Sequence, residues 1–181
     1  MKIRLSQSTL QARLKWCGLS AVVVFVVLQL ADAVLKAKTG AGVTDLLLAG
    51  SGPSARFIID RWQSPTDAIW VGFGLGFGFL FILLYGLALH SGTILARERF
   101  APAPGALRRL LDALSIAPIV AVLCDLAENT LCLTMLSNGP SEILATLTFQ
   151  AAVIKGAAFI AGLLPTLAAA GALLIRRKPQ G

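Results

Sequence analysis

Long apolar runs separated by short polar connections dominate this chain. Four runs reach the roughly 20 residues that an α-helix needs to cross the hydrocarbon core of a bilayer. We therefore predict an all-α protein, a transmembrane four-helix bundle built as a single membrane domain over residues 1–181. The predicted spans cover about residues 17–37, 68–96, 113–136 and 143–175, and residues 38–67 form a long external segment.

Two prolines lie inside the third and fourth predicted spans. Pro118 and Pro165 each lack a backbone N–H, so each removes one hydrogen bond from its helix. We expect local bends at both positions. Such bends either border a functional site or fit the length of the helix to the membrane.

The composition of the chain also indicates a membrane protein. The 181 residues are 56% hydrophobic and 14% charged, whereas about 25% of a soluble domain is charged, so we expect the lipid bilayer as a partner. The net charge of +7 comes from residues at the ends of apolar runs, without interleaved aromatics, and we expect no nucleic-acid partner. The three cysteines lack the spacing of a metal motif, and we expect no metal, no cofactor and no disulfide framework.

The basic residues predict how the chain sits in the membrane. Of the sixteen Lys and Arg residues, eleven lie in the N-terminal tail, the connection between the second and third spans, and the C-terminus. Four more lie near or within the external segment, where aspartates offset them, and the sixteenth is Lys155, inside an apolar run. The positive-inside rule predicts a multi-pass protein of the inner (cytoplasmic) membrane with both termini cytoplasmic.

The first span has a second interpretation as a cleavable signal peptide. A basic leader, an apolar core and the triplet Ala31-Asp32-Ala33 are typical of such peptides. The apolar stretch is longer than a usual signal core, and Asp32 can pair with Lys36 one turn later, so we predict a retained anchor. Cleavage would leave three spans with unchanged sidedness.

The external segment predicts a short interfacial helix in its second half. In SGPSARFIIDRW, Ser51 is a candidate cap and Pro53 falls in the first turn. We expect Phe57, Ile58 and Trp62 to lie on the membrane surface. The helix either covers the bundle or acts as a spacer anchored by Trp62. The interfacial aromatic residues that we predict are Trp62, Phe57 and Trp70, the last at the start of the second span.

Alternating glycines open the second span. They form two overlapping GxxxG pairs, and glycines four residues apart let helix backbones approach closely in lipid. We predict helix packing within the bundle, and a contact between copies in a homo-oligomer stays open. No strand precedes these glycines, so they do not form a dinucleotide loop. The glycines concerned are Gly72, Gly74, Gly76 and Gly78.

A polar cluster inside the third and fourth spans is the main candidate site. Asp125, Glu128 and Asn129 share one face of a helix, and Lys155 lies level with Asp125 on the neighbouring span. We predict that Lys155 pairs with Asp125, that Asn129 helps satisfy this pair, and that Glu128 is either protonated or reaches water. Tyr85 in the second span is predicted to form a hydrogen bond within the bundle.

These polar residues leave several functions open. The cluster either receives a polar ligand, a lipid headgroup or a proton within the bundle, or is a clamp that fixes the register of two helices. We favour the binding role, with a lipid or small molecule as the ligand. The alternatives are an intramembrane enzyme acting on lipids or isoprenoids, with Glu128 as acid and base, and a scaffold subunit with a membrane partner. We assign no catalytic residue and regard a non-enzyme as the better interpretation.

Several segments together resemble a known family. The external segment with GVTDLLLAGSG and RFIIDRW, the span with LGFGFLFILLYG and the third span with CDLAENTL are similar to an uncharacterised family of small four-span bacterial membrane proteins. The most specific part is the D-x-x-E-N motif of Asp125, Glu128 and Asn129. In that family an acidic residue often stands where this chain has Gly78. The resemblance implies the four-span fold and no particular activity.

Overall fold

The computed structural model describes residues 6–100 and 105–175 of the chain, and these residues form seven α-helices. The all-α fold and the four-helix transmembrane bundle are confirmed, because four stretches are long and apolar enough to cross a membrane: α1, α4, α5 with α6, and α7. The helices are α1 (Gln7–Thr39), α2 (Val43–Leu47), α3 (Gly52–Ile59), α4 (Pro65–Arg99), α5 (Gly105–Leu114), α6 (Ala117–Asn138) and α7 (Glu142–Ile175).

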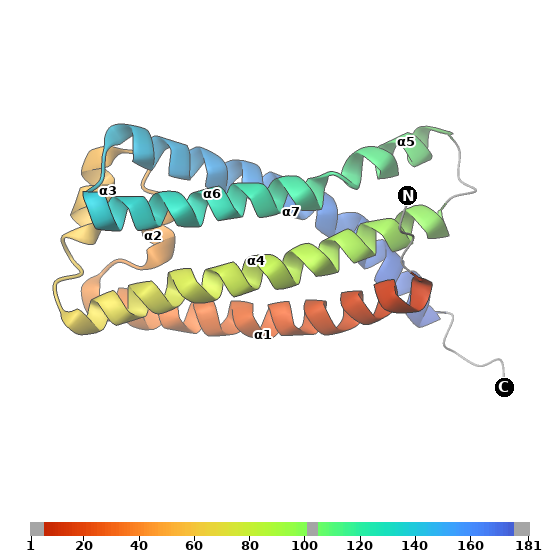
Figure 1. The fold of residues 1–181 in the computed structure, drawn as a ribbon, viewed down its shortest axis with the longest axis horizontal. Helices are drawn as coiled ribbons and strands as arrows, with labels where there is room; N and C mark the ends of the chain where they lie inside the picture. Colours follow the sequence, from red (N-terminus) through yellow and green to blue (C-terminus); the bar gives the residue numbers. More distant parts are fainter. Residues whose placement is uncertain (1–5, 101–104, 176–181) are drawn as a thin grey trace.

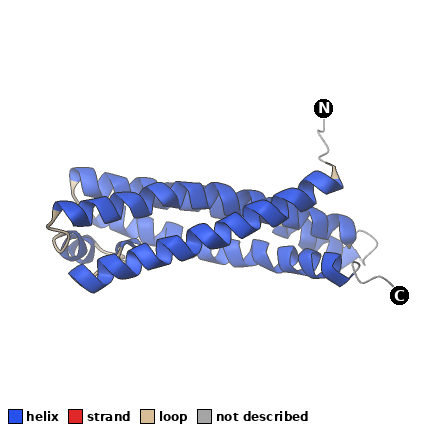
Figure 2. Ribbon diagram, turned by 90° about the horizontal axis from the view of Figure 1, so that it is seen from below, coloured by secondary structure: helices blue, strands red, loops and turns tan. Residues whose placement is uncertain are grey.

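The long helices run alternately up and down an elongated bundle (Figures 1 and 2). Helices α2 and α3 close one end, called here the α2–α3 end, and α5 lies at the other. Helix α1 packs mainly on α4, α6 packs mainly on α7, and α4 also contacts both α6 and α7. Among the described residues α1 has no extensive contact with α6 or α7. One long helix is therefore attached to the bundle along a single neighbour.

Local sequence signals explain where the helices at the α2–α3 end begin and stop. Helix α1 ends at Thr39 and is followed by the cap Gly40, whose φ of 83° suits a residue without a side chain. The Ser51 side chain accepts from the backbone N–H of Ser54 at 3.4 Å, as a helix cap should, and confirms the predicted start of α3. The sequence analysis did not predict α2, in which Asp45 accepts from the backbone N–H of Gly42 at 2.8 Å.

The third membrane span is broken in two. Helix α5 ends at Leu114 and α6 begins at Ala117, with Pro118 in its first turn, where a missing N–H has no cost. Figure 1 shows the two helices meeting at an angle. The expected bend at Pro118 is thus a break between helices, whereas Pro165 lies inside the continuous helix α7.

A cluster of apolar side chains fixes the α2–α3 end. Leu35, Leu46 and Val71 from three helices are buried together there. Ile58 of α3 joins them and is only 8% exposed. The prediction that Ile58 lies on the membrane surface is therefore wrong, because the bundle itself provides the apolar surface that covers this side chain.

The four glycines of α4 point to two different sides. A Cβ added at Gly74 would lie 3.5 Å from Val43, and one at Gly78 would lie 2.8 Å from Nδ2 of Asn129, so this pair faces the bundle. Gly72 and Gly76 are exposed, and a Cβ there would meet nothing within 4 Å. A contact between copies through that second pair stays a prediction.

Gly92 brings α4 close to α7, and enlarging it should destabilise the bundle. A Cβ at Gly92 would overlap the side chain of Thr166, which is buried and donates to the carbonyl of Gly162 at 2.8 Å. We expect Gly92→Val to lower the free energy of unfolding by roughly 1–3 kcal/mol, because overpacking displaces a well-packed neighbour. Thermal unfolding in detergent measures this. Gly76→Val is the control, and an equal loss in both variants would contradict the close contact.

Candidate functional site

Helices α6 and α7 bring two carboxylates and an ammonium together. Asp125 and Glu128 lie one turn apart on α6, and the short turn at residues 139–141 returns α7 alongside as an antiparallel neighbour. The Nζ atom of Lys155 is 2.7 Å from Oε1 of Glu128 and 3.3 Å from Oδ1 of Asp125. The predicted pair with Asp125 is present, but the shorter contact is with Glu128, which the prediction had left outside the pair.

Tyr85 ties α4 to the same cluster. Its hydroxyl donates to Oδ2 of Asp125 at 3.0 Å, and its ring lies between Phe81 and Phe159, with centroid distances of 4.9 and 5.3 Å. Both oxygens of Asp125 therefore have partners, one from Lys155 and one from Tyr85. This arrangement links α4, α6 and α7 at one level of the membrane, as a clamp would.

One buried polar atom of the cluster lacks a partner. Both carboxylate oxygens of Glu128 lie 2.7 Å from Nζ of Lys155, and the Glu128 side chain is 0% exposed. Nδ2 of Asn129 has no hydrogen-bond partner among the described residues. The sequence analysis predicted that Asn129 helps to satisfy the Asp125–Lys155 pair, but its Nδ2 atom donates no hydrogen bond to that pair. Buried polar atoms of this kind are rare in native proteins and call for a physical explanation.

A cavity of about 230 Å³ gives these atoms a common environment. It lies between α1 with α2 on one side and the polar cluster on the other, next to the inward face of α4. Most of its border is apolar, and polar side chains lie on both sides, Asp32 with Thr44 on α1 and α2 and the cluster on α6 and α7. Residues that border it include Phe25, Asp32, Thr44, Trp70, Gly78, Phe81, Asp125, Glu128, Asn129 and Lys155.

The cavity is acidic. Three carboxylates border it, those of Asp32, Asp125 and Glu128, against the single ammonium of Lys155 among the described residues that line it. Opposite charges attract more strongly here than in water because the surroundings have a low dielectric constant. The sequence analysis considered Asp32 only as a partner of Lys36 and did not place it at the site.

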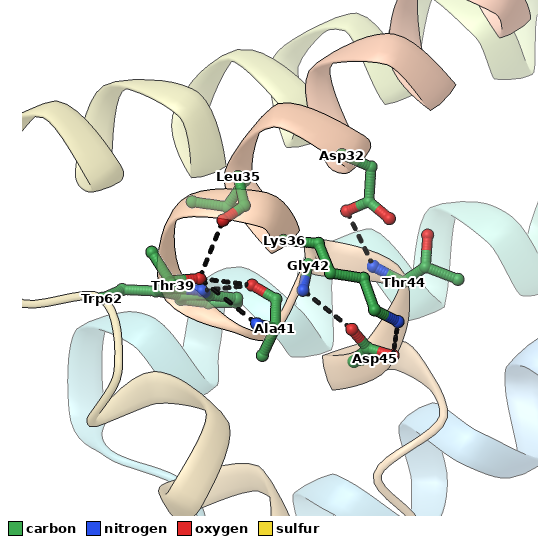
Figure 3. A network of polar contacts seen from close by, with 9 residues as sticks. All are labelled: Asp32, Leu35, Lys36, Thr39, Ala41, Gly42, Thr44, Asp45 and Trp62. Carbon is green, nitrogen blue, oxygen red and sulfur yellow. Dashed lines mark hydrogen bonds and ion pairs between the residues drawn. The ribbon is translucent and has the colours of Figure 1, made fainter.

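A polar network holds α2 as one wall of the cavity (Figure 3). The Lys36 ammonium pairs with Oδ1 of Asp45 at 2.8 Å, and the backbone N–H of Thr44 donates to Asp32 at 3.3 Å. The predicted Asp32–Lys36 pair is therefore wrong, since the returning chain offers each residue another partner. Asp45 is the sequence signal for the start of α2, because its carboxylate accepts from the backbone N–H of Gly42 three residues earlier.

The three predicted interfacial aromatic residues have different surroundings. Trp70 borders the cavity. Trp62 is half-buried and donates from Nε1 to the carbonyl of Ala41 at 2.9 Å, within the network of Figure 3. Phe57 is 60% exposed, with the guanidinium of Arg61 4.4 Å from its ring centroid. A position of these residues at the membrane surface stays a prediction.

The cluster has the composition of an ion-pair site. Among the described residues, no group of three or more His, Cys, Asp or Glu side chains could hold a metal ion. Comparison of the chain with protein-family models, curated proteins and solved structures gave no match. What the site offers chemically is a set of charges and hydrogen-bonding atoms beside a mostly apolar cavity.

Removing the ammonium should strongly destabilise the protein. Lys155→Met leaves Asp125 and Glu128 buried without their cation, and we expect a loss of about 3–5 kcal/mol in the free energy of unfolding. Thermal unfolding in detergent measures the loss, and adding Glu128→Gln should restore part of it. The control is Arg97→Met, which removes a half-exposed pair with Asp112 and should change little. Unchanged stability of Lys155→Met would contradict the clamp.

The α2 network should loosen in acid. Burial raises the pKa of Asp45, but hydrogen bonds from Lys36 and the Gly42 N–H outweigh it and hold that pKa below its ordinary value of 3.8. A carboxylate whose pKa is lower in the folded than in the unfolded state stabilises the fold at any pH above the unfolded pKa. This stabilisation is lost as the pH falls through the pKa of the folded state. We expect α2 to detach only below about pH 3.8.

Trp62 reports this detachment in a chain whose other two tryptophans are replaced by phenylalanine. Its emission should shift to longer wavelength as α2 loosens in acid, because its hydrogen bond to Ala41 lies in the same network. Asp45→Asn should show the shifted emission already at neutral pH. Identical acid profiles for the two chains would argue that Asp45 does not hold the network.

Proposed function

We propose that this membrane protein binds the polar group of a lipid or other amphipathic small molecule in the cavity beside the Asp125–Glu128–Lys155 cluster. The observation that carries the proposal is that one cavity is bordered by both the buried charges and aromatic and aliphatic side chains. Ligand sites are typically mostly apolar, with a few converging polar groups. The cavity has this character.

A purely structural clamp accounts for only part of the cluster. The oxygens of Asp125 have partners from Lys155 and Tyr85, which explains how three helices are held together. Nδ2 of Asn129 has no hydrogen-bond partner among the described residues, and Asn129 borders the cavity. The clamp does not account for this donor, and this supports a binding role in addition to the clamp.

The arrangement of the helices also suits an amphipathic ligand. Helix α1 packs along α4 without extensive contact to α6 or α7 among the described residues, and the cavity lies between them. A ligand held by its polar group would keep its hydrocarbon chain among apolar side chains or lipid tails. The positive-inside prediction puts the α2–α3 end on the external side of the inner membrane. We propose this orientation in the membrane, and we also propose that the chain is related to the uncharacterised four-span family.

Native mass spectrometry of the gently solubilised protein tests the proposal. We expect a lipid or small molecule to remain bound to the wild type. Glu128→Gln should retain at least about tenfold less of it, because the loss of a hydrogen bond to a charged group costs about 1.5–3 kcal/mol. Gly76→Ala, on the exposed face of α4, is the control and should retain the ligand.

Two outcomes would count against binding. The first is a wild type that carries no bound species, and the second is equal retention by the wild type and Glu128→Gln. A bound species that is converted chemically during incubation would instead support the alternative of a lipid-modifying enzyme.

A further inference from the structure

We infer that α5 and the basic residues around it form a binding surface for anionic phospholipids of the adjacent leaflet. Arg108 and Arg109 bind the lipid phosphates, and Leu107 and Leu110 insert among the acyl chains next to them. This surface lies at the opposite end of the bundle from α2 and α3, called here the α5 end (Figure 1). It is separate from the cavity and does not depend on the proposed function.

The length of α6 places α5 at the edge of the hydrocarbon core. The 22 residues of α6 rise about 33 Å at 1.5 Å per residue, which already crosses a core of about 30 Å. Helix α5 precedes α6 in the chain and meets it at an angle (Figure 1). It is therefore not needed to complete the third span, and it lies level with the lipid headgroups.

The sequence of α5 separates apolar and charged side chains onto opposite faces. Leucines recur at i, i+3, i+4 and i+7 and therefore share one face. They are Leu107, Leu110, Leu111 and Leu114. The charged side chains lie on the other face and are those of Arg108, Arg109 and Asp112. A basic amphipathic helix of this kind is typical of a helix that lies in the plane of a membrane surface.

The bundle covers only one edge of the apolar face of α5. Leu111 is 8% exposed and packs with Leu10 of α1 and Leu95 of α4. Leu107 and Leu110, in contrast, are 40% and 53% exposed. Two leucines are far fewer than the roughly 20 residues that each side of a stable protein interface contributes. They suit shallow insertion among acyl chains instead.

The charged face of α5 carries two cations without a carboxylate partner. Arg97 of α4 pairs with Asp112, which is the only carboxylate of α5. Arg108 and Arg109 are exposed and form no ion pair with a described residue, and all nine Asp and Glu residues of the chain lie in the described ranges. Both guanidinium groups are therefore open to an external anion. Guanidinium suits phosphate because it can donate two parallel hydrogen bonds.

The two ends of the bundle differ in charge. Among the described residues, the α5 end has Arg13, Lys15, Arg97, Arg99, Arg108 and Arg109 against Glu98 and Asp112. The α2–α3 end has Lys36, Lys38, Arg56 and Arg61 against Asp32, Asp45, Asp60, Asp67 and Glu142. Cations thus outnumber carboxylates only at the α5 end. An anionic membrane surface attracts this end, and each Lys or Arg near such a surface is worth about fivefold in affinity.

Trp16 of α1 supports headgroup contact at the same end. Its side chain is 60% exposed, and the ammonium of Lys15 lies 4.8 Å from its ring centroid. The start of α1 lies beside the end of α4, because Gln7 donates to Glu98 at 3.3 Å. Tryptophan is enriched where hydrocarbon meets headgroups, since its ring is apolar and its N–H is polar. An exposed tryptophan and lysine therefore lie near the level at which α5 leaves the bundle.

Native mass spectrometry of the delipidated full chain, titrated with one lipid at a time, tests the surface. The probes are phosphatidylglycerol, which is anionic, and phosphatidylcholine, which has no net charge, with the same dioleoyl chains. We expect the wild type to bind the anionic lipid at least about 25-fold more tightly. Arg108→Gln with Arg109→Gln should weaken the anionic lipid by about 25-fold and leave phosphatidylcholine unchanged, because two cations are lost.

Arg56→Gln with Arg61→Gln is the matched control. It also removes two exposed arginines, but from the α2–α3 end, and should keep the preference for the anionic lipid. Added salt should weaken phosphatidylglycerol binding by the wild type, because salt screens exposed charges. Equal losses in the two double variants would overturn the inference, as would a wild type that binds both lipids alike.

A fluorescent label tests the insertion of α5. Two single-cysteine chains, Leu110→Cys and Arg109→Cys, carry an environment-sensitive dye in a background whose three native cysteines are replaced by alanine. In phosphatidylglycerol vesicles, a quencher attached to the acyl chains should quench the dye at position 110 more strongly, because the two positions lie on different faces of α5. Equal quenching at both positions would overturn the placement of α5 in the membrane surface.

The apolar edge of α5 separates a lipid from a second copy of the chain as its partner. Leu107→Ser with Leu110→Ser should weaken both lipids by at least about tenfold, because less apolar surface is buried among the acyl chains. The oligomeric state, measured in the same mass spectra, should not change. A dimer that is lost in this variant, with lipid binding unchanged, would assign the edge to a second copy and overturn the inference.

Discussion

The cost of ionised side chains inside hydrocarbon governs this structure. Each one costs about 2.5–3.5 kcal/mol at the centre of a span, and Asp125, Glu128 and Lys155 place three of them in two neighbouring helices. Lys155 contacts both carboxylates, and Tyr85 donates to Asp125 from a third helix. The packing that offsets the cost therefore also fixes the relative register of α4, α6 and α7, because sliding any of them would separate these groups.

Helix α1 takes no part in that cluster, and the cavity follows from this. It is held by α4 along its length and by the network around α2 at one end, where Asp32 accepts from Thr44 and Lys36 pairs with Asp45. No hydrogen bond or ion pair joins α1 to α6 or α7 among the described residues, and the space between them is bordered by apolar side chains, by Asp32 of α1 and by the cluster. The clamp and the cavity thus have the same cause: the buried ion pairs and their hydrogen bonds join α4, α6 and α7 but do not include α1.

The sequence predicted those features that depend only on residues close together in the chain. Asp125, Glu128, Asn129 and Lys155 stand out because apolar residues surround them, and the capping pattern at Ser51 located α3. The exchange of partners by Asp32 and Lys36 was not predictable in this way, because Asp45 and Thr44 reach them only once the chain has turned back. Ile58 was misplaced because an amphipathic helix looks the same whether a bilayer or a bundle covers its apolar face.

The two acidic residues of the motif have different degrees of freedom. Asp125 has partners on both oxygens and cannot move without loosening α4. Glu128 is fully buried, and its Oε2 lies 2.7 Å from Nζ of Lys155. Lys155 serves both carboxylates and keeps 24% of its side chain exposed, more than either of its partners. Of the three charged side chains, the lysine is therefore the one that retains the most accessible surface.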